Sequence, residues 1–187
     1  MRGLTEAPEE RPTLLGRPLA RDVAVVVAWF AVAAIVGAVV WWQVTPLAEF
    51  TRTSTNAQMD ESQLGTQVAA DGWFFVIGIV GGLVSGIALL LLLRRDPVAA
   101  VVLVTLGALL ATWLMLRLGL WLGPANPKDV LAHVPVGHKV PVQLKTSATG
   151  VDFAWPLGVL LGAIGVLWGS EDRRRADIED LVSENRG

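Results

Sequence analysis

The stretch 73-WFFVIGIVGGLVSGIALLLLLRRDPVAAVVLVTLGALLATWLMLRLGLWL-122 decides the fold. Its two apolar runs, residues 73–93 and 98–122, are each long enough to cross a hydrocarbon layer of about 30 Å as a helix. The four residues between them, Arg94 to Pro97, are polar and end in a helix-breaking proline. The stretch therefore predicts a transmembrane helical hairpin.

Two further apolar runs flank this hairpin. Residues 23–44 form a run that is too long for the apolar region of a signal peptide, which has about 7–15 residues. Residues 152–169 are short for a crossing, but a triplet of arginines, Arg173 to Arg175, follows directly. We expect an all-α membrane protein, a four-helix transmembrane bundle over residues 23–169.

Composition agrees with this expectation and excludes several functions. The chain is 53% hydrophobic and 17% charged, far from a typical soluble composition. A net charge of -2 without a long basic block gives no reason to expect nucleic acid binding. The chain has no Cys, its His133 and His138 lack further ligands at metal-site spacing, and hydrolase and ATPase motifs are absent. We expect no enzyme, no metal and no cofactor.

The distribution of basic residues predicts the orientation. Ten of the 15 Lys and Arg residues lie in the two terminal segments and the hairpin turn, and four lie in the loops 45–72 and 123–151. Cytoplasmic loops are enriched in Lys and Arg, so a plasma-membrane protein with both termini in the cytoplasm and the two loops outside is expected. Tryptophans at the ends of spans are expected to anchor it at the membrane interfaces, namely Trp41, Trp42, Trp73, Trp121, Trp155 and Trp168.

The segments outside the spans have patterns of their own. Residues 1–22 are too polar and proline-rich for a core and predict a disordered tail. In residues 170–187, Ile178, Leu181 and Val182 predict a short amphipathic helix. In the outer loops, residues 139–145 alternate as a strand, residues 50–55 could pair with it, and Asn126 to Asp129 predict a short helix start. The loops should form a small extracytoplasmic cap with short β elements.

Glycines recur every fourth residue in spans two and four, at Gly78, Gly82, Gly86, Gly158 and Gly162. This spacing places them on one face of each helix and permits close backbone approach. Contact between spans two and four inside one chain is the first interpretation. The alternative is a seam with a second copy or another membrane protein.

Arg117 is the only charge well inside a span, and an intramembrane charge is by default a functional hypothesis. Asp71 and Asp152 lie near the same depth, just before spans two and four. The three could form a charge cluster that joins the cap to the bundle or binds a lipid headgroup. The alternative is that Arg117 extends alone to lipid phosphate.

The outer-face pattern resembles an uncharacterised family of small actinobacterial membrane proteins. The residues that carry the resemblance are Trp41, Trp42, Pro46, Ala70 to Trp73, Arg117, Gly119, Val136, Gly137, Leu144 and Trp155 to Leu157. The resemblance implies the four-span layout in a plasma membrane and brings no activity with it. We expect a non-enzymatic accessory or scaffold protein whose loops bind an envelope component or a larger membrane complex; the alternative is a subunit of a lipid or small-molecule transporter.

Overall fold

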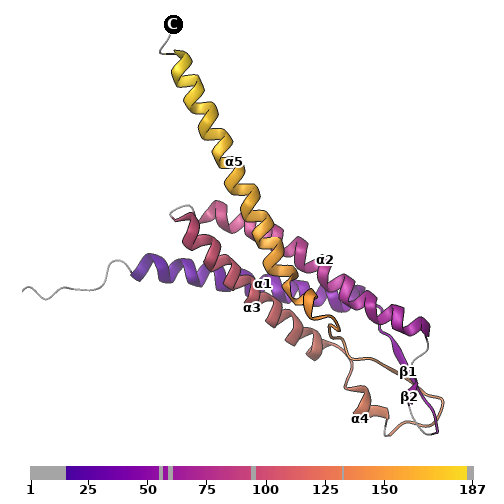
Figure 1. Ribbon diagram of the computed structural model, residues 1–187. Helices are drawn as coiled ribbons and strands as arrows, with labels where there is room; N and C mark the ends of the chain where they lie inside the picture. The colour runs from indigo at the N-terminus through magenta and orange to yellow at the C-terminus, as the bar shows by residue number, and fades with distance from the viewer. Residues whose placement is uncertain (1–15, 55–56, 59–60, 94–95, 132, 185–187) are drawn as a thin grey trace, which may run out of the picture.

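Four long helices make up most of the computed structural model, which describes residues 16–54, 57–58, 61–93, 96–131 and 133–184. They are α1 (Gly16–Val44), α2 (Glu61–Leu92), α3 (Pro97–Leu122) and α5 (Ala154–Glu184) (Figure 1). Each of the four overlaps a candidate membrane span, a stretch long and apolar enough to cross a membrane. In chain order these spans are Leu19–Val44, Val68–Leu92, Pro97–Leu131 and Thr149–Ser170. The predicted four-helix bundle is confirmed.

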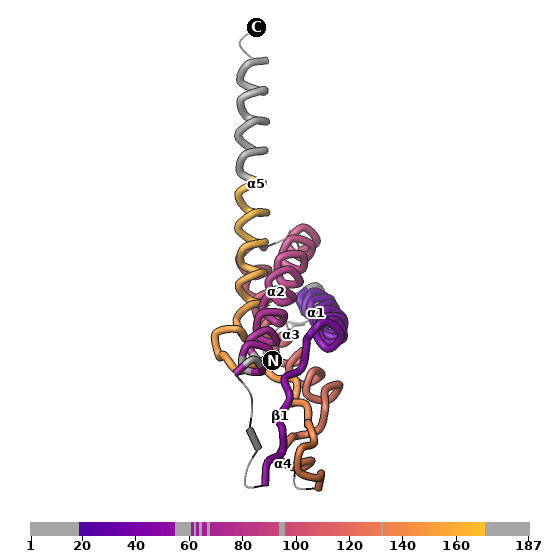
Figure 2. The backbone as a smooth tube through the Cα atoms, turned by 90° about the vertical axis from the view of Figure 1, so that its right-hand side faces the viewer, coloured from indigo at the N-terminus to yellow at the C-terminus, as the bar shows by residue number. Residues whose placement is uncertain are grey.

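The remaining elements gather at one end of the bundle (Figure 1). Strand β1 (Glu49–Arg52) lies between β2 (Ala57–Gln58) and β3 (Lys139–Pro141), and both neighbours are antiparallel to it. The short helix α4 (Pro127–Leu131) lies beside this sheet (Figure 2). We call these four elements and the segments that join them the cap, and the end of the bundle that carries them the cap end.

The strand predicted over residues 139–145 is shorter than expected. Its ladder with β1 ends at Pro141, which has no N–H to donate. One more backbone bond, from the Val142 N–H to the Ala48 carbonyl at 2.7 Å, continues the alignment. Val142 and Leu144 are still buried, so the predicted alternation of buried and polar side chains extends beyond the hydrogen-bonded strand.

The helices pack as two pairs, α1 with α3 and α2 with α5. Glycines let the bulky side chains of α1 lie against α3: a Cβ added at Gly107 would overlap the Phe30 ring. The largest fully buried side chains are Trp41, Trp155, Phe30 and Phe74. Three of these four rings, Trp41, Trp155 and Phe30, lie against glycines of a facing helix.

Three helices run beyond the boundaries that hydropathy predicts. Helix α1 begins at Gly16, inside the predicted tail 1–22, while residues 1–15 lie outside the described residues. Helix α2 begins at Glu61, inside the predicted loop 45–72. Helix α5 continues to Glu184, so residues 170–184 extend the fourth helix where a separate amphipathic helix was expected. The sequence after Gly169 holds no Gly or Pro before Gly187 that would end the helix.

Candidate functional site

The junction between the cap and the bundle centres on a buried carboxylate. Asp71 lies in α2 near the cap end and is 8% exposed. One of its oxygens accepts a hydrogen bond from the Ser147 N–H at 2.8 Å, and the other accepts one from the Ala148 N–H at 3.1 Å. Hydrogen bonds to an ionised acceptor are stronger than neutral ones. Asp71 thus fixes the chain where it returns from the cap to the bundle.

Asp152 holds the same return segment from its other side. Its carboxylate accepts a hydrogen bond from the Thr146 hydroxyl at 3.2 Å. Its backbone carbonyl accepts one from the Thr112 hydroxyl of α3 at 3.1 Å. Asp152 lies in the 3-10 helix η1 (Thr149–Phe153), directly before α5. We call residues 146–152 the return segment; it is attached to α2 through Asp71 and to α3 through Thr112.

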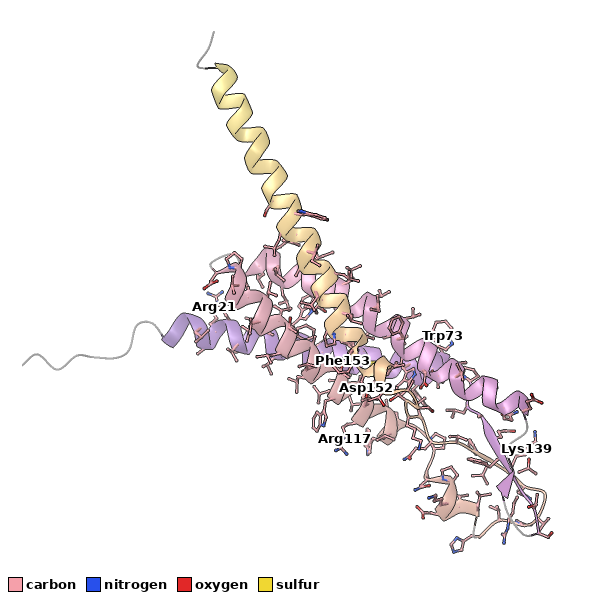
Figure 3. The ribbon with its side chains drawn as sticks, in the orientation of Figure 1. Arg21, Trp73, Arg117, Lys139, Asp152 and Phe153 are labelled. Carbon is pink, nitrogen blue, oxygen red and sulfur yellow. The ribbon has the colours of Figure 1, made fainter. Side chains whose placement is uncertain are left out.

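Arg117 does not join these two carboxylates. Its side chain is exposed on α3, and its guanidinium carbon lies 5.5 Å from the centroid of the Trp113 ring. Within the described residues it forms no ion pair, and Figure 3 shows Arg117 on α3 and Asp152 just before α5. The prediction that Asp71, Arg117 and Asp152 form one charge cluster is therefore wrong. Arg117 follows the buried Met115 by two residues, and positions two apart lie on different helix faces.

Two of the tryptophans predicted as interface anchors are core residues. The Trp41 ring is fully buried, its Nε1 donates to the Ala70 carbonyl at 2.9 Å, and it packs edge-on against Phe74. The Trp155 ring is 1% exposed, and its Nε1 lies 3.3 Å from the Met115 sulfur. A helix-end position does not tell whether a residue faces the bundle or its surroundings. The remaining four are exposed, as an anchor requires: Trp42, Trp73, Trp121 and Trp168.

The glycine positions of α2 and α5 lie against each other. A Cβ added at Gly86 would meet the Val159 carbonyl oxygen at 2.6 Å, and one at Gly162 would meet the Leu83 carbonyl oxygen at 2.7 Å. The Cβ positions of Gly78, Gly82 and Gly158 are obstructed in the same way by atoms of the facing helix. This is the intramolecular contact that the glycine spacing predicts, and these five glycines face the inside of the bundle.

A groove of about 850 Å³ opens between α1 and α2. It exists because each of these helices packs mainly against another partner, α3 or α5. Its lining is apolar, and Trp155, seated between Gly37 and Gly81, contributes to it. One polar pair crosses the groove, with the Trp29 Nε1 donating to the Ser85 hydroxyl at 3.0 Å. The hydropathy of the sequence did not predict the groove, because a groove depends on the distance between two helices.

The histidines do not suggest a metal centre. His133 and His138 are both exposed, and His133 Nδ1 lies 2.9 Å from the Asp129 carbonyl oxygen of its own turn. Among the residues that the structure describes, no group of three or more His, Asp or Glu side chains could hold a metal ion.

No family model, no curated protein and no solved structure matches the chain. The resemblance to an actinobacterial family stays a prediction.

Proposed function

We propose that the chain is a multi-pass plasma-membrane protein with its cap outside the cell and both termini in the cytoplasm. Four apolar helices of sufficient length support the membrane location. The excess of Lys and Arg in the terminal segments supports the orientation, since basic residues are retained on the cytoplasmic side.

Within that frame the chain acts as a non-enzymatic accessory or scaffold protein. The observation that carries this proposal is the attachment of the return segment to the bundle. Asp71 accepts hydrogen bonds from the N–H groups of Ser147 and Ala148, and the Thr112 hydroxyl donates to the Asp152 carbonyl. A rigid junction of this kind holds the cap at a fixed angle to the membrane. Fixed orientation matters for a surface that must meet another component of the envelope.

The cap itself is internally braced. Lys139 of β3 and Glu49 of β1 form an ion pair at 3.2 Å, and Arg52 donates to the Val134 carbonyl. The loop between α4 and β3 is left exposed, with Val136 63% accessible at its turn. Val136 is therefore an apolar position of the cap where a charge can be introduced at the surface without disturbing the core.

Gentle purification of the full chain from its native membrane tests this function, with mass spectrometry of what accompanies it. We expect a stoichiometric protein partner that is lost in Val136→Glu. A charge on the membrane-facing surface, such as Val102→Glu in α3, would disturb the membrane and cannot serve as a control. The matched control is Pro135→Ser, a change at the exposed residue next to Val136 that adds no charge to the loop. Absence of any stoichiometric protein would refute the accessory role.

The groove between α1 and α2 favours a second candidate, a subunit of a lipid or small-molecule transporter. An apolar groove open to the hydrocarbon accommodates an acyl chain. Bound lipid without a protein partner in the same purification would favour this role. Ala28→Leu, which adds bulk at an exposed position of the groove lining, should then reduce the amount of lipid.

A further inference from the structure

Three side chains form a column on the outward face of α3. Trp113, Arg117 and Trp121 are spaced four residues apart, so they lie one above another along the helix. All three are exposed, Trp113 at 53% and Trp121 at 80%. The same face continues away from the cap with apolar side chains, at Leu109, Leu106 and Val102. The column is therefore a cationic point between two aromatic rings on an otherwise apolar surface.

The described part of the chain supplies no anion for Arg117. The nearest candidates by depth, Asp71 and Asp152, are used by the Ser147 and Ala148 N–H groups and by the Thr146 hydroxyl. A guanidinium that faces hydrocarbon needs a counter-charge, because burial without one is unfavourable. The counter-charge for Arg117 therefore comes from outside the described residues.

The depth of Arg117 indicates where that anion lies. Arg117 is five residues before Leu122, the end of α3, which corresponds to about 8 Å along the helix axis. Trp121 is one turn nearer the end, and exposed Trp residues prefer the headgroup level of a bilayer. A phosphate at the level of Trp121 is thus about one helical turn from Arg117, and the guanidinium fork can bind phosphate through two N–H groups.

The bulk of this face argues against a partner helix as the source of the anion. Helices associate in membranes through small residues that let their backbones approach. Here the exposed positions carry two indole rings and leucines. A flexible lipid can fit around these side chains more easily than a rigid helix.

We propose that Arg117, flanked by Trp113 and Trp121, binds the phosphate of an anionic phospholipid in the leaflet at the cap end. The proposal rests on the membrane location proposed above but not on the accessory role, because the column lies on the bundle and not on the cap. Trp113 holds the guanidinium from the side away from the cap, and Trp121 packs beside the glycerol and headgroup.

The test uses the full chain in mild detergent with equal amounts of phosphatidylglycerol and phosphatidylcholine, and native mass spectrometry of the bound lipid. We expect one phosphatidylglycerol to be retained in preference to phosphatidylcholine. Arg117→Leu should weaken that preference roughly tenfold, since a charge-assisted contact is lost. Arg117→Lys should keep part of it. Lys128→Gln, which removes one positive charge from α4, is the matched control and should keep all of it.

Three results would overturn the proposal. The first is equal retention of the two lipids by the wild-type chain. The second is an unchanged preference in Arg117→Leu, with an unchanged melting temperature showing that the variant is folded; Arg117→Gln repeats the test if it is not. The third is displacement of the lipid by millimolar glycerol 3-phosphate, which would make a free phosphate the ligand. Loss of a co-purifying protein from Arg117→Leu without a change in lipid would instead assign the site to a partner's carboxylate.

Discussion

Gly82→Ala should destabilise the bundle although it adds only one methyl group. The new Cβ would lie 3.0 Å from the Val159 nitrogen and 3.1 Å from the Gly158 Cα, and closer still to the Trp155 carbonyl oxygen. All three obstacles are backbone atoms of α5, so no side-chain rotation can relieve the overlap. Helix α5 must move away from α2.

The magnitude follows from the size of that movement. Carbon atoms pack at about 3.5–4.0 Å, so the helices must separate by up to about 1 Å, and a gap of that size forfeits a quarter to a half of each neighbouring dispersion contact. Overpacking of this kind costs about 1–3 kcal/mol. The better helix propensity of Ala returns up to about 1 kcal/mol. We expect a net loss of about 1–2 kcal/mol.

The assay is the melting temperature of the purified chain in one detergent, with Gly165→Ala as the matched control. Gly165 lies in α5, the helix that packs against α2, and nothing lies within 4 Å of its Cβ position. For a chain of this size 1 kcal/mol corresponds to about 2–4 °C. Gly82→Ala should therefore melt about 2–8 °C lower, whereas Gly165→Ala should melt at the wild-type temperature or slightly above it. Equal melting temperatures for the two variants would refute the close packing of α2 on α5.

The other predictions concern the junction, the core and the topology. Asp71→Ala and Arg117→Leu should have additive effects on the free energy of unfolding, within about 0.5 kcal/mol, because the two side chains share no contact; a larger coupling in a double-mutant cycle would restore the ionic cluster. Trp155→Ala should cost about 3–5 kcal/mol by leaving a cavity between α1 and α2, and a denaturant midpoint within error of the wild type would contradict its central position. In the Cys-free chain, Val136→Cys should react with an impermeant maleimide from outside intact cells and Ser170→Cys should not, and labelling of Ser170→Cys under those conditions would rule out the proposed orientation.

Some features of the fold follow directly from local sequence. The apolar runs predict four helices because length and hydropathy are properties of a segment alone. The glycine spacing of α2 and α5 predicts a close helix contact because residues four apart share a face in any helix. The alternation of buried and polar side chains in β3 and the start of α4 at Pro127 could likewise be predicted from neighbouring residues alone.

The wrong predictions about Trp41, Trp155 and Arg117 needed the rotation of a helix about its own axis. Trp41 and Trp42 are neighbours with the same residue type and depth, yet one is fully buried and the other is 42% exposed. Arg117, Asp71 and Asp152 have comparable depth, but Arg117 points away from the bundle while Asp71 faces the return segment. Depth along a span can be counted from the sequence, whereas the azimuth around it is set by the neighbouring helices.

The sequence by itself therefore determined the number of helices, their apolar character and the glycine faces, since each depends on residues close together in the chain. Only the tertiary structure decided which helices pair, that a groove separates α1 from α2, and that Trp155 fills the centre of the bundle. It also decided that Asp71 serves the return segment and that Arg117 is left facing outward between two tryptophans. These features depend on contacts between segments tens of residues apart, whose geometry is fixed by mutual packing and not by local propensity.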